Sequence, residues 1–271
     1  MASSTAGLPD ARTLGDIVIP IARSGLLERS DQPDFRYKSD RSLLTEADRL
    51  VQQRLQTALA EHWPAIAFLG EEMPAEQQQR LLERDDSLLW CLDPLDGTRN
   101  FAYGVPFFAV SLALLAGGEP ILGLVYDPLR DECFTACRGA GARLNDLPLP
   151  PPTAAPALEN SVALVDFKRL APALAGRIAA SHPFGSQRSF GAVALDWCWL
   201  ACGRAHVYLH GGQKLWDYAA GHLILHECGG HSITLDGEPV FSADLAPRSV
   251  AAALDGGLFA SWTRWLGIPG C

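Results

Sequence analysis

The strongest constraint on the fold is a series of apolar segments at residues 107–145, separated by turn residues. The stretch reads FFAVSLALLAGGEPILGLVYDPLRDECFTACRGAGARLN, in which clusters of Gly, Pro and Asp interrupt the apolar runs. Apolar runs bounded by such clusters are typical of strands that follow one another through turns. The stretch therefore predicts an antiparallel sheet in the first half of the chain.

Helical and strand patterns flank this stretch on both sides. Before it, the spacing of apolar residues predicts helices over 10–28 and 46–59 and buried strands over 66–72 and 88–94, which run into acidic residues. After it, the patterns predict a strand at 161–167, helices near 169–180 and over 191–203, a strand at 205–210 and a helix over 216–230. The chain is therefore expected to mix helices and sheets.

The stretch LPLPPPTAAPA at 147–157 is the one clear shift in composition. Its prolines favour an extended connector, because proline continues neither a helix nor a central strand. A chain of 271 residues with 48% hydrophobic residues suits one large domain or two smaller ones in close contact. We therefore expect two halves, residues 1–150 and 151–271, that meet at this connector.

Charge and cysteine content restrict the partners and the compartment. The formal net charge of −9, from 22 basic and 31 acidic residues, argues against nucleic acid or an anionic membrane as the main partner. No apolar stretch reaches the roughly 18 residues of a membrane span, and the N-terminal MASSTAGLPDART lacks the features of a signal peptide. The seven cysteines are odd in number and scattered, as expected of reduced thiols. These features predict a cytoplasmic protein.

Four acidic residues stand where a strand ends or a helix begins: Glu71, Asp93, Asp96 and Asp217. Singly, each has an ordinary explanation as a turn residue or as an acidic residue in the first turn of a helix. Together they suggest more, because Asp93 and Asp96 flank Leu95 so closely that two carboxylates and a backbone carbonyl can converge. Hard divalent cations prefer such oxygen ligands, and two Mg²⁺ ions would offset four negative charges. The cluster therefore predicts a metal centre that can accept a phosphate group in an acidic protein.

Gly97 and Thr98 follow the acidic cluster directly, in the sequence WCLDPLDGTRNF at 90–101. If these two residues open a helix, their backbone N–H groups form a seat for phosphate oxygens, and the threonine hydroxyl adds a contact. Asp48 stands three residues after Thr45, a spacing that resembles a helix capping box. Asp48 therefore has a structural interpretation beside any catalytic one.

Five segments together resemble the inositol monophosphatase family of Mg²⁺-dependent phosphatases. They are DPLDGTRNF (93–101), GEE (70–72), WDYAAG (216–221), KSDRSLLTEAD (38–48) and SFGAVALDWCWLACGRA (189–205). Because they occur in the family's order and spacing, the resemblance covers nearly the whole chain. It implies a layered α/β fold, an αβαβα sandwich with the site between the halves, and commonly a homodimer.

The resemblance also implies a role for individual residues. Two to three Mg²⁺ ions would be held by Glu71, Asp93, the carbonyl of Leu95, Asp96 and Asp217. Thr98 and Asp48 would orient and deprotonate the attacking water, with Glu71 near a further ion and its water. The implied substrate contacts are Lys38, Asp96, Gly97, Thr98, Gly191, Ala192, Val193, His210 and Asp217. Inhibition by Li⁺ is a further expectation from the family.

The side of the site that faces the substrate's alcohol departs from the family pattern. His210 stands where inositol-specific members carry a glutamate that accepts hydrogen bonds from ring hydroxyls, and His206 replaces an acidic residue four positions earlier. A neutral imidazole accepts one hydrogen bond at most. This departure counts against myo-inositol phosphate in particular. The acidic cluster with Thr98 and Asp48 predicts a small phosphate monoester as substrate, with inositol 1-phosphate or a sugar phosphate first. Histidinol phosphate, adenosine 3',5'-bisphosphate and a noncatalytic regulatory role stay open as alternatives.

Two further patterns favour packing over function. His222 and His226 are spaced so that they can pair on a helix face, but HLILH lacks the glutamate of a zinc hydrolase motif. Trp197 and Trp199 lie in an apolar helical context, which favours the core or a subunit contact.

Overall fold

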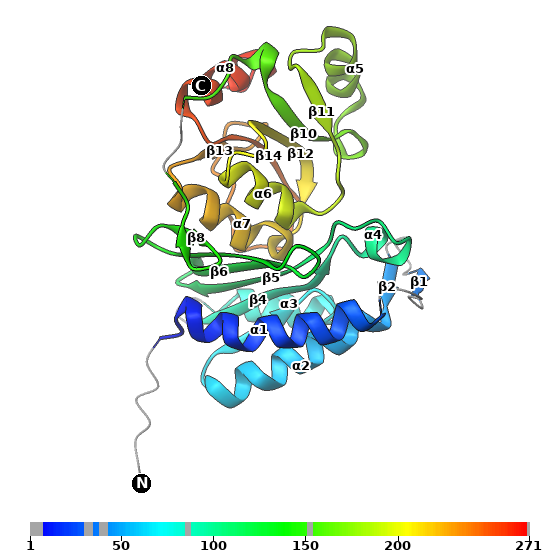
Figure 1. Cartoon of the computed structure of the whole chain (residues 1–271), viewed down its shortest axis with the longest axis vertical. Coiled ribbons are helices and arrows are strands. Elements are labelled where there is room, and N and C mark those ends of the chain that lie inside the picture. Colours follow the sequence, from blue (N-terminus) through cyan, green and yellow to red (C-terminus); the bar gives the residue numbers. More distant parts are fainter. Residues whose placement is uncertain (1–7, 30–34, 38–42, 85–87, 151–153, 270–271) are drawn as a thin grey trace.

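Two β-sheets alternate with three layers of helices, so that the layer order is α, β, α, β, α (Figure 1). This computed structural model describes residues 8–29, 35–37, 43–84, 88–150 and 154–269. The first helix layer consists of α1 (Ala11–Leu26) and α2 (Glu46–His62), the middle layer of α6 (Val193–Ala201) and α7 (Leu215–Glu227), and the last of α5 (Pro172–Ser181) and α8 (Gly256–Leu266). None of the helices in these residues is long and apolar enough to cross a lipid bilayer.

The larger sheet confirms the antiparallel arrangement predicted for residues 107–145. Its strand order is β3 (Ala67–Gly70), β4 (Leu89–Asp96), β5 (Ala109–Ala116), β6 (Glu119–Asp127), β7 (Glu132–Cys137), β8 (Ala142–Leu144) and β9 (Leu147–Pro148). From β4 to β9 each strand pairs antiparallel with the next, whereas β3 pairs parallel to β4. The turns predicted at the Gly, Pro and Asp clusters therefore connect neighbouring strands.

The smaller sheet is mixed and comes from the second half of the chain. Its order is β11 (Ser186–Arg188), β10 (Val162–Asp166), β12 (Val207–Gln213), β14 (Arg248–Ala253) and β13 (His231–Ile233). Strand β10 runs parallel to β11 and β12, while β14 runs antiparallel to β12 and β13. The proline-rich connector lies between the two sheets along the chain, and the division into two halves stays a prediction.

Short elements complete the fold, and three of the predicted helices and strands have other bounds in the structure than in the prediction. They are β1 (Phe35–Tyr37), β2 (Leu43–Thr45), α3 (Ala75–Leu82), α4 (Thr98–Ala102) and the 3₁₀ turns η1 (Leu27–Arg29), η2 (Leu158–Asn160) and η3 (Phe167–Arg169). The strand expected over 66–72 ends at Gly70, the helix expected from 169 begins at Pro172 because η3 precedes it, and the helix expected over 191–203 spans 193–201. Proline suits that first helical position because its missing N–H is not needed there.

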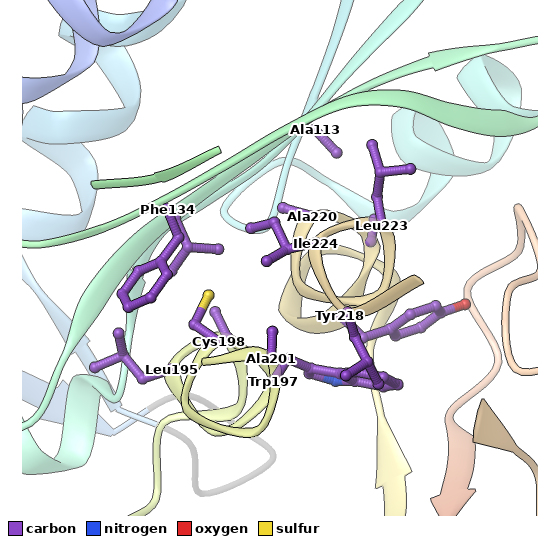
Figure 2. Packing of buried hydrophobic residues seen from close by; sticks show 14 of the residues in the cluster. Ala113, Phe134, Leu195, Trp197, Cys198, Ala201, Tyr218, Ala220, Leu223 and Ile224 are labelled. Carbon is purple, nitrogen blue, oxygen red and sulfur yellow. The ribbon is translucent and has the colours of Figure 1, made fainter. Parts of the chain in front are cut away.

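The strand period of two divides the core between the layers. Trp90 and Leu92 of β4 pack in the cluster that includes α1 and α2, whereas Leu89 and Cys91 pack in the cluster that includes α6 and α7. Figure 2 shows the second cluster, where Phe134 and Ala113 of the large sheet lie against side chains of α6 and α7. Ile224 of α7 is fully buried there, and burial of such a side chain contributes about 1.5–3 kcal/mol. Tight packing of the middle layer holds both helix starts near the end of β4.

Candidate metal centre and active site

The end of β4 carries the two carboxylates that the sequence analysis singled out. Asp93 shares the face of β4 that Cys91 presents to the middle helix layer, and it is 2% exposed. Its Oδ1 accepts the backbone N–H of Leu95 at 2.9 Å. The pairing of β4 with β5 is irregular between Asp93 and Asp96, around Pro94, which has no N–H to donate. This irregularity lets both carboxylates stand at the same end of the strand.

Asp96 links the large sheet to the start of α6. One of its oxygens accepts the N–H of Val193 at 3.1 Å, and the other accepts the N–H of Ala194 at 2.7 Å. A carboxylate at a helix N-terminus satisfies N–H groups that have no partner within the helix. Asp96 therefore fixes the segment after Gly191 beside the end of β4.

Glu71 and Asp217 reach the same region from distant parts of the sequence. Glu71 lies in the turn after β3, and its N–H donates to the carbonyl of Leu92 at 3.0 Å, one residue before Asp93. Asp217 lies in the first turn of α7, where its Oδ2 accepts the N–H of Lys214 at 2.8 Å. The parallel pairing of β3 with β4 and the packing of α7 on the large sheet thus gather the four acidic residues.

These carboxylates repel one another in a buried setting. Burial raises the pKa of Asp93 well above its usual value, and the charges of Glu71, Asp96 and Asp217 raise it further. Burial also raises the pKa of Asp96 to about 7, although the amides of α6 work against it. For Asp217, burial and then the charge of Asp96 raise the pKa to about 7. The cluster therefore holds more negative charge than its surroundings compensate.

The donor chemistry of this cluster fits Mg²⁺. Carboxylate oxygens and the carbonyl of Leu95 are hard oxygen donors, and a divalent cation would relieve the repulsion that raises these pKa values. Within the described part of the chain, however, no three His, Cys, Asp or Glu side chains are arranged to hold one ion as they stand. Asp93, Asp96 and Asp217 each accept a hydrogen bond from a backbone amide instead.

Asp48 and Thr98 meet beside this cluster. The two carboxylate oxygens of Asp48 make different contacts, so the structural and the catalytic interpretation of this residue are compatible. Its Oδ2 accepts the N–H and the hydroxyl of Thr45, both at 2.6 Å, and the N–H of Asp48 donates back to Thr45, so the predicted capping box is present. Its Oδ1 accepts the hydroxyl of Thr98 at 3.4 Å. The same hydroxyl lies 2.9 Å from the carbonyl of Leu95. One carboxylate oxygen thus serves the helix and the other faces Thr98.

Gly97 makes the sharp turn that brings Thr98 to this place. Its φ is +86°, and a Cβ there would lie 2.9 Å from the carbonyl oxygen of Phe107 and 3.1 Å from the Cβ of Ala192. A side chain at this position would therefore be strained and crowded. Thr98 begins α4 directly after the turn, so both residues do open a helix, as the sequence analysis anticipated.

The predicted substrate-side residues divide into three groups. Gly191 and Val193 border the start of α6 beside Asp96, whereas Ala192 is fully buried and packs towards Gly97. His210 lies in the middle of β12, where the regular pairing with β14 is interrupted, and is 3% exposed. Lys38 lies outside the described residues.

His206 is not brought to this place. Its Nδ1 accepts the N–H of Val162 at the start of β10, and it precedes β12, whereas His210 lies four residues further along the chain in that strand. Four strand residues span about 13 Å. His206 therefore joins two strands at the end of the sheet that lies away from the carboxylates.

The sequence analysis missed two polar residues beside the site. Asn100 donates from Nδ2 to the carbonyls of Phe107 and Phe190, both at 2.7 Å, and so ties α4 to the segment before Gly191. Asp166 at the end of β10 lies 3.3 Å from Nε2 of His210. An acidic residue that ends a buried strand is the signal that identified Asp93, and it would have found Asp166 as well.

Comparison with known proteins agrees with this arrangement. A sequence profile described as the inositol monophosphatase family matches residues 11–263. The chain is 34% identical over 249 residues to "Nus factor SuhB" of Pasteurella multocida, covering 84% of this chain and 87% of that protein. It is 35% identical over 226 residues to "Inositol monophosphatase 1" of Solanum lycopersicum, covering 80% and 82%. The chain belongs to the inositol monophosphatase family.

A solved structure supports the fold class. The extragenic suppressor protein suhB from Bartonella henselae matches with a TM-score of 0.79 and 27% identity, covering 96% of this chain and all of that one. The layered α/β fold expected from the sequence is therefore confirmed.

Proposed function

We propose that this protein is a Mg²⁺-dependent phosphatase that hydrolyses a small phosphate monoester. The observation that carries the proposal is the position of the Thr98 hydroxyl, which lies between Asp48 and the Leu95 carbonyl and next to the acidic cluster. Membership of the inositol monophosphatase family supports it. An orienting hydroxyl, a carboxylate and a cluster of hard oxygen donors are the groups that hydrolysis by water requires.

Glu71, Asp93, Asp96, Asp217 and the carbonyl of Leu95 would hold the Mg²⁺ ions, two or three in number. When bound, the ions would supply positive charge for the phosphate oxygens and would lower the pKa of water in the site. Of the residues that would hold them, Asp93, Asp96 and Asp217 have raised pKa values, and the charge of Glu71 helps to raise the pKa of Asp93 and Asp96. Their side chains would turn from backbone amides towards the ions.

The chain's own groups would position the reactants. Oδ2 of Asp48 is held by Thr45, and Oδ1 faces the Thr98 hydroxyl. Oδ1 would therefore accept the proton of the attacking water, either directly or by way of this hydroxyl. The backbone N–H groups of Gly97 and Thr98 would hold phosphate oxygens at the start of α4. Gly191, Val193 and His210 would face the alcohol that leaves.

Inositol 1-phosphate and related sugar phosphates are the first substrates to test. The relative from Solanum lycopersicum is named an inositol monophosphatase, which supports them. Purified protein with Mg²⁺ should release phosphate from at least one member of a panel that also contains histidinol phosphate and adenosine 3',5'-bisphosphate. A folded protein that binds Mg²⁺ yet releases phosphate from none of them would refute the proposal. Inhibition by Li⁺, a homodimer and a cytoplasmic location stay predictions.

A noncatalytic regulatory role is the second candidate, because the relative from Pasteurella multocida is named a Nus factor. The two candidates separate in a strain that lacks the gene for this protein. If Asp96→Ala restores the phenotype as fully as the wild type, regulation through contacts is favoured. If only the wild type restores it, catalysis is favoured.

A further inference from the structure

The turn η3 lies directly on β12 beside His210. A Cβ at Gly211 would overlap the carbonyl oxygen of Arg169, so the backbone of η3 touches the strand at the residue that follows His210. Asp166 begins the turn by accepting the N–H of Lys168 at 3.2 Å. Tertiary contact and local capping therefore hold Lys168 and Arg169 at a set place next to the alcohol side of the site.

His210 has both ring nitrogens engaged within the chain. The N–H of Gly212 donates to Nδ1 at 3.1 Å, so the ring proton lies on Nε2, which faces Oδ2 of Asp166 at 3.3 Å. A ring held in this way offers little to the hydroxyls of a neutral polyol. The sequence departure at His210 thus has a structural counterpart, because the imidazole is committed to Asp166.

Asp166 is in turn balanced by positive charge. Burial alone would raise the pKa of Asp166, but the hydrogen bond from His210 and the charge of Lys168 lower it, so the carboxylate stays ionised. The ammonium of Lys168 lies 3.5 Å from Oδ2 of Asp166, and 65% of its side chain is exposed. Lys168 therefore neutralises Asp166 while its amine stays open to solvent.

Arg169 adds a second cation next to Lys168. It is exposed, and its backbone carbonyl lies against Gly211 of β12, the residue that follows His210. The segment 166–169 holds one carboxylate, Asp166, and two cations, Lys168 and Arg169, so it carries a net positive charge in a protein whose net charge is −9. A guanidinium binds carboxylate and phosphate groups through paired N–H donors.

We propose that Arg169, assisted by Lys168, is a second anion subsite, and that the alcohol portion of the substrate carries a second phosphate or a carboxylate. This inference rests on the proposed phosphatase function and narrows its substrate class. A substrate whose alcohol portion carries an ammonium group would be repelled by these two cations, and a neutral polyol would leave them unused.

Matched substrate pairs test the subsite directly. Glycerol 2-phosphate and 2-phosphoglycerate differ by a carboxylate, and 3'-AMP and adenosine 3',5'-bisphosphate differ by a phosphate. Release of the shared phosphate should show a kcat/KM about ten-fold higher for the more anionic member of at least one pair, since hydrogen bonds to charged groups are worth about that factor. Added salt should reduce the ratio, because the subsite is exposed. The pair that shows the preference tells whether a carboxylate or a phosphate is the natural group.

Arg169→Gln should bring this ratio close to one, and Lys168→Gln should lower it by a smaller factor. Arg264→Gln is the matched control, because Arg264 is an exposed arginine of α8, which packs on the face of the smaller sheet away from α6 and α7. Equal kcat/KM within both pairs, or an unchanged ratio in Arg169→Gln, would refute the anion subsite. Phosphate release in the same assays would still support the phosphatase function. Failure to release phosphate from any of the four compounds and from inositol 1-phosphate would count against the phosphatase instead.

Discussion

Replacing Thr98 by alanine tests the arrangement that carries the proposed function. The change removes one hydroxyl, which contacts Oδ1 of Asp48 at 3.4 Å and the Leu95 carbonyl at 2.9 Å. Loss of a group that takes part in general acid–base catalysis costs about 100- to 10,000-fold in rate. We therefore expect Thr98→Ala to lower kcat by a factor in that range.

The fold should tolerate this change. Loss of a partly buried hydrogen bond costs ~1 kcal/mol, which lowers the Tm of a chain of this size by about 2–4 °C. Mg²⁺ binding should be kept, because none of the proposed side-chain ligands is altered. Thr98→Ser should restore most of the activity, since it retains the hydroxyl.

The assay is phosphate release from the best substrate of the panel, with Mg²⁺ affinity measured by calorimetry on the same samples. Thr57→Ala is the control, because Thr57 is an exposed threonine of α2 whose hydroxyl donates to the carbonyl of Gln53 in the same helix. The assigned role would be refuted if Thr98→Ala kept kcat within about three-fold of the wild type, because loss of a catalytic group lowers the rate by far more. A parallel loss of Mg²⁺ affinity would assign Thr98 to metal binding instead.

Three further predictions concern charge. Asp93→Asn should abolish turnover through lost Mg²⁺ affinity, and a variant with normal Mg²⁺ affinity would contradict this. The same change should stabilise the metal-free protein at pH 8, because asparagine avoids the cost of a buried carboxyl group whose pKa is raised by burial and by the charges of its neighbours. The raised pKa values of about 7 for Asp96 and Asp217 mean that the metal-free protein loses stability as pH rises from about 4 to 7. At pH 8, Mg²⁺ at about 100 times its Kd should therefore stabilise the protein by ~2.7 kcal/mol, and the same Mg²⁺ concentration should raise Tm less at pH 5. An equal Tm shift at both pH values would count against the cluster as the binding site. Burial and then His226 lower the pKa of His222 to about 3, so its contribution to stability is complete above about pH 6.5 and is lost as pH falls towards 3. In acid unfolding, His222→Gln should therefore reduce the loss of stability between about pH 6.5 and pH 3. His62→Gln changes an exposed histidine and should leave this loss unchanged.

The sequence predicted the elements whose signals are local. Glycine, proline and aspartate clusters identified the strands of residues 107–145, and apolar spacing identified α1, α2 and α7, because these patterns depend on neighbouring residues alone. Strand β14 was missed although it lies inside the smaller sheet between β12 and β13. Its sequence RSVAAA is rich in alanine, which favours helices, so pairing with its neighbours decides its conformation.

The candidate site likewise has parts that local sequence predicts and parts that only the tertiary structure brings together. The turn at Gly97, the capping box of Thr45 and Asp48 and the pair of carboxylates at the end of β4 were determined by the sequence itself, since each depends on residues within a few positions.

The tertiary structure alone decided which distant groups meet them. Glu71 arrives through the parallel pairing of β3 with β4, Asp217 through the packing of α7, and Asp166 meets His210 because β10 and β12 pair in that register. Electrostatic effects depend on distance and burial, and long-range packing sets both, so the raised pKa values and the partner of His210 could not be read from the sequence.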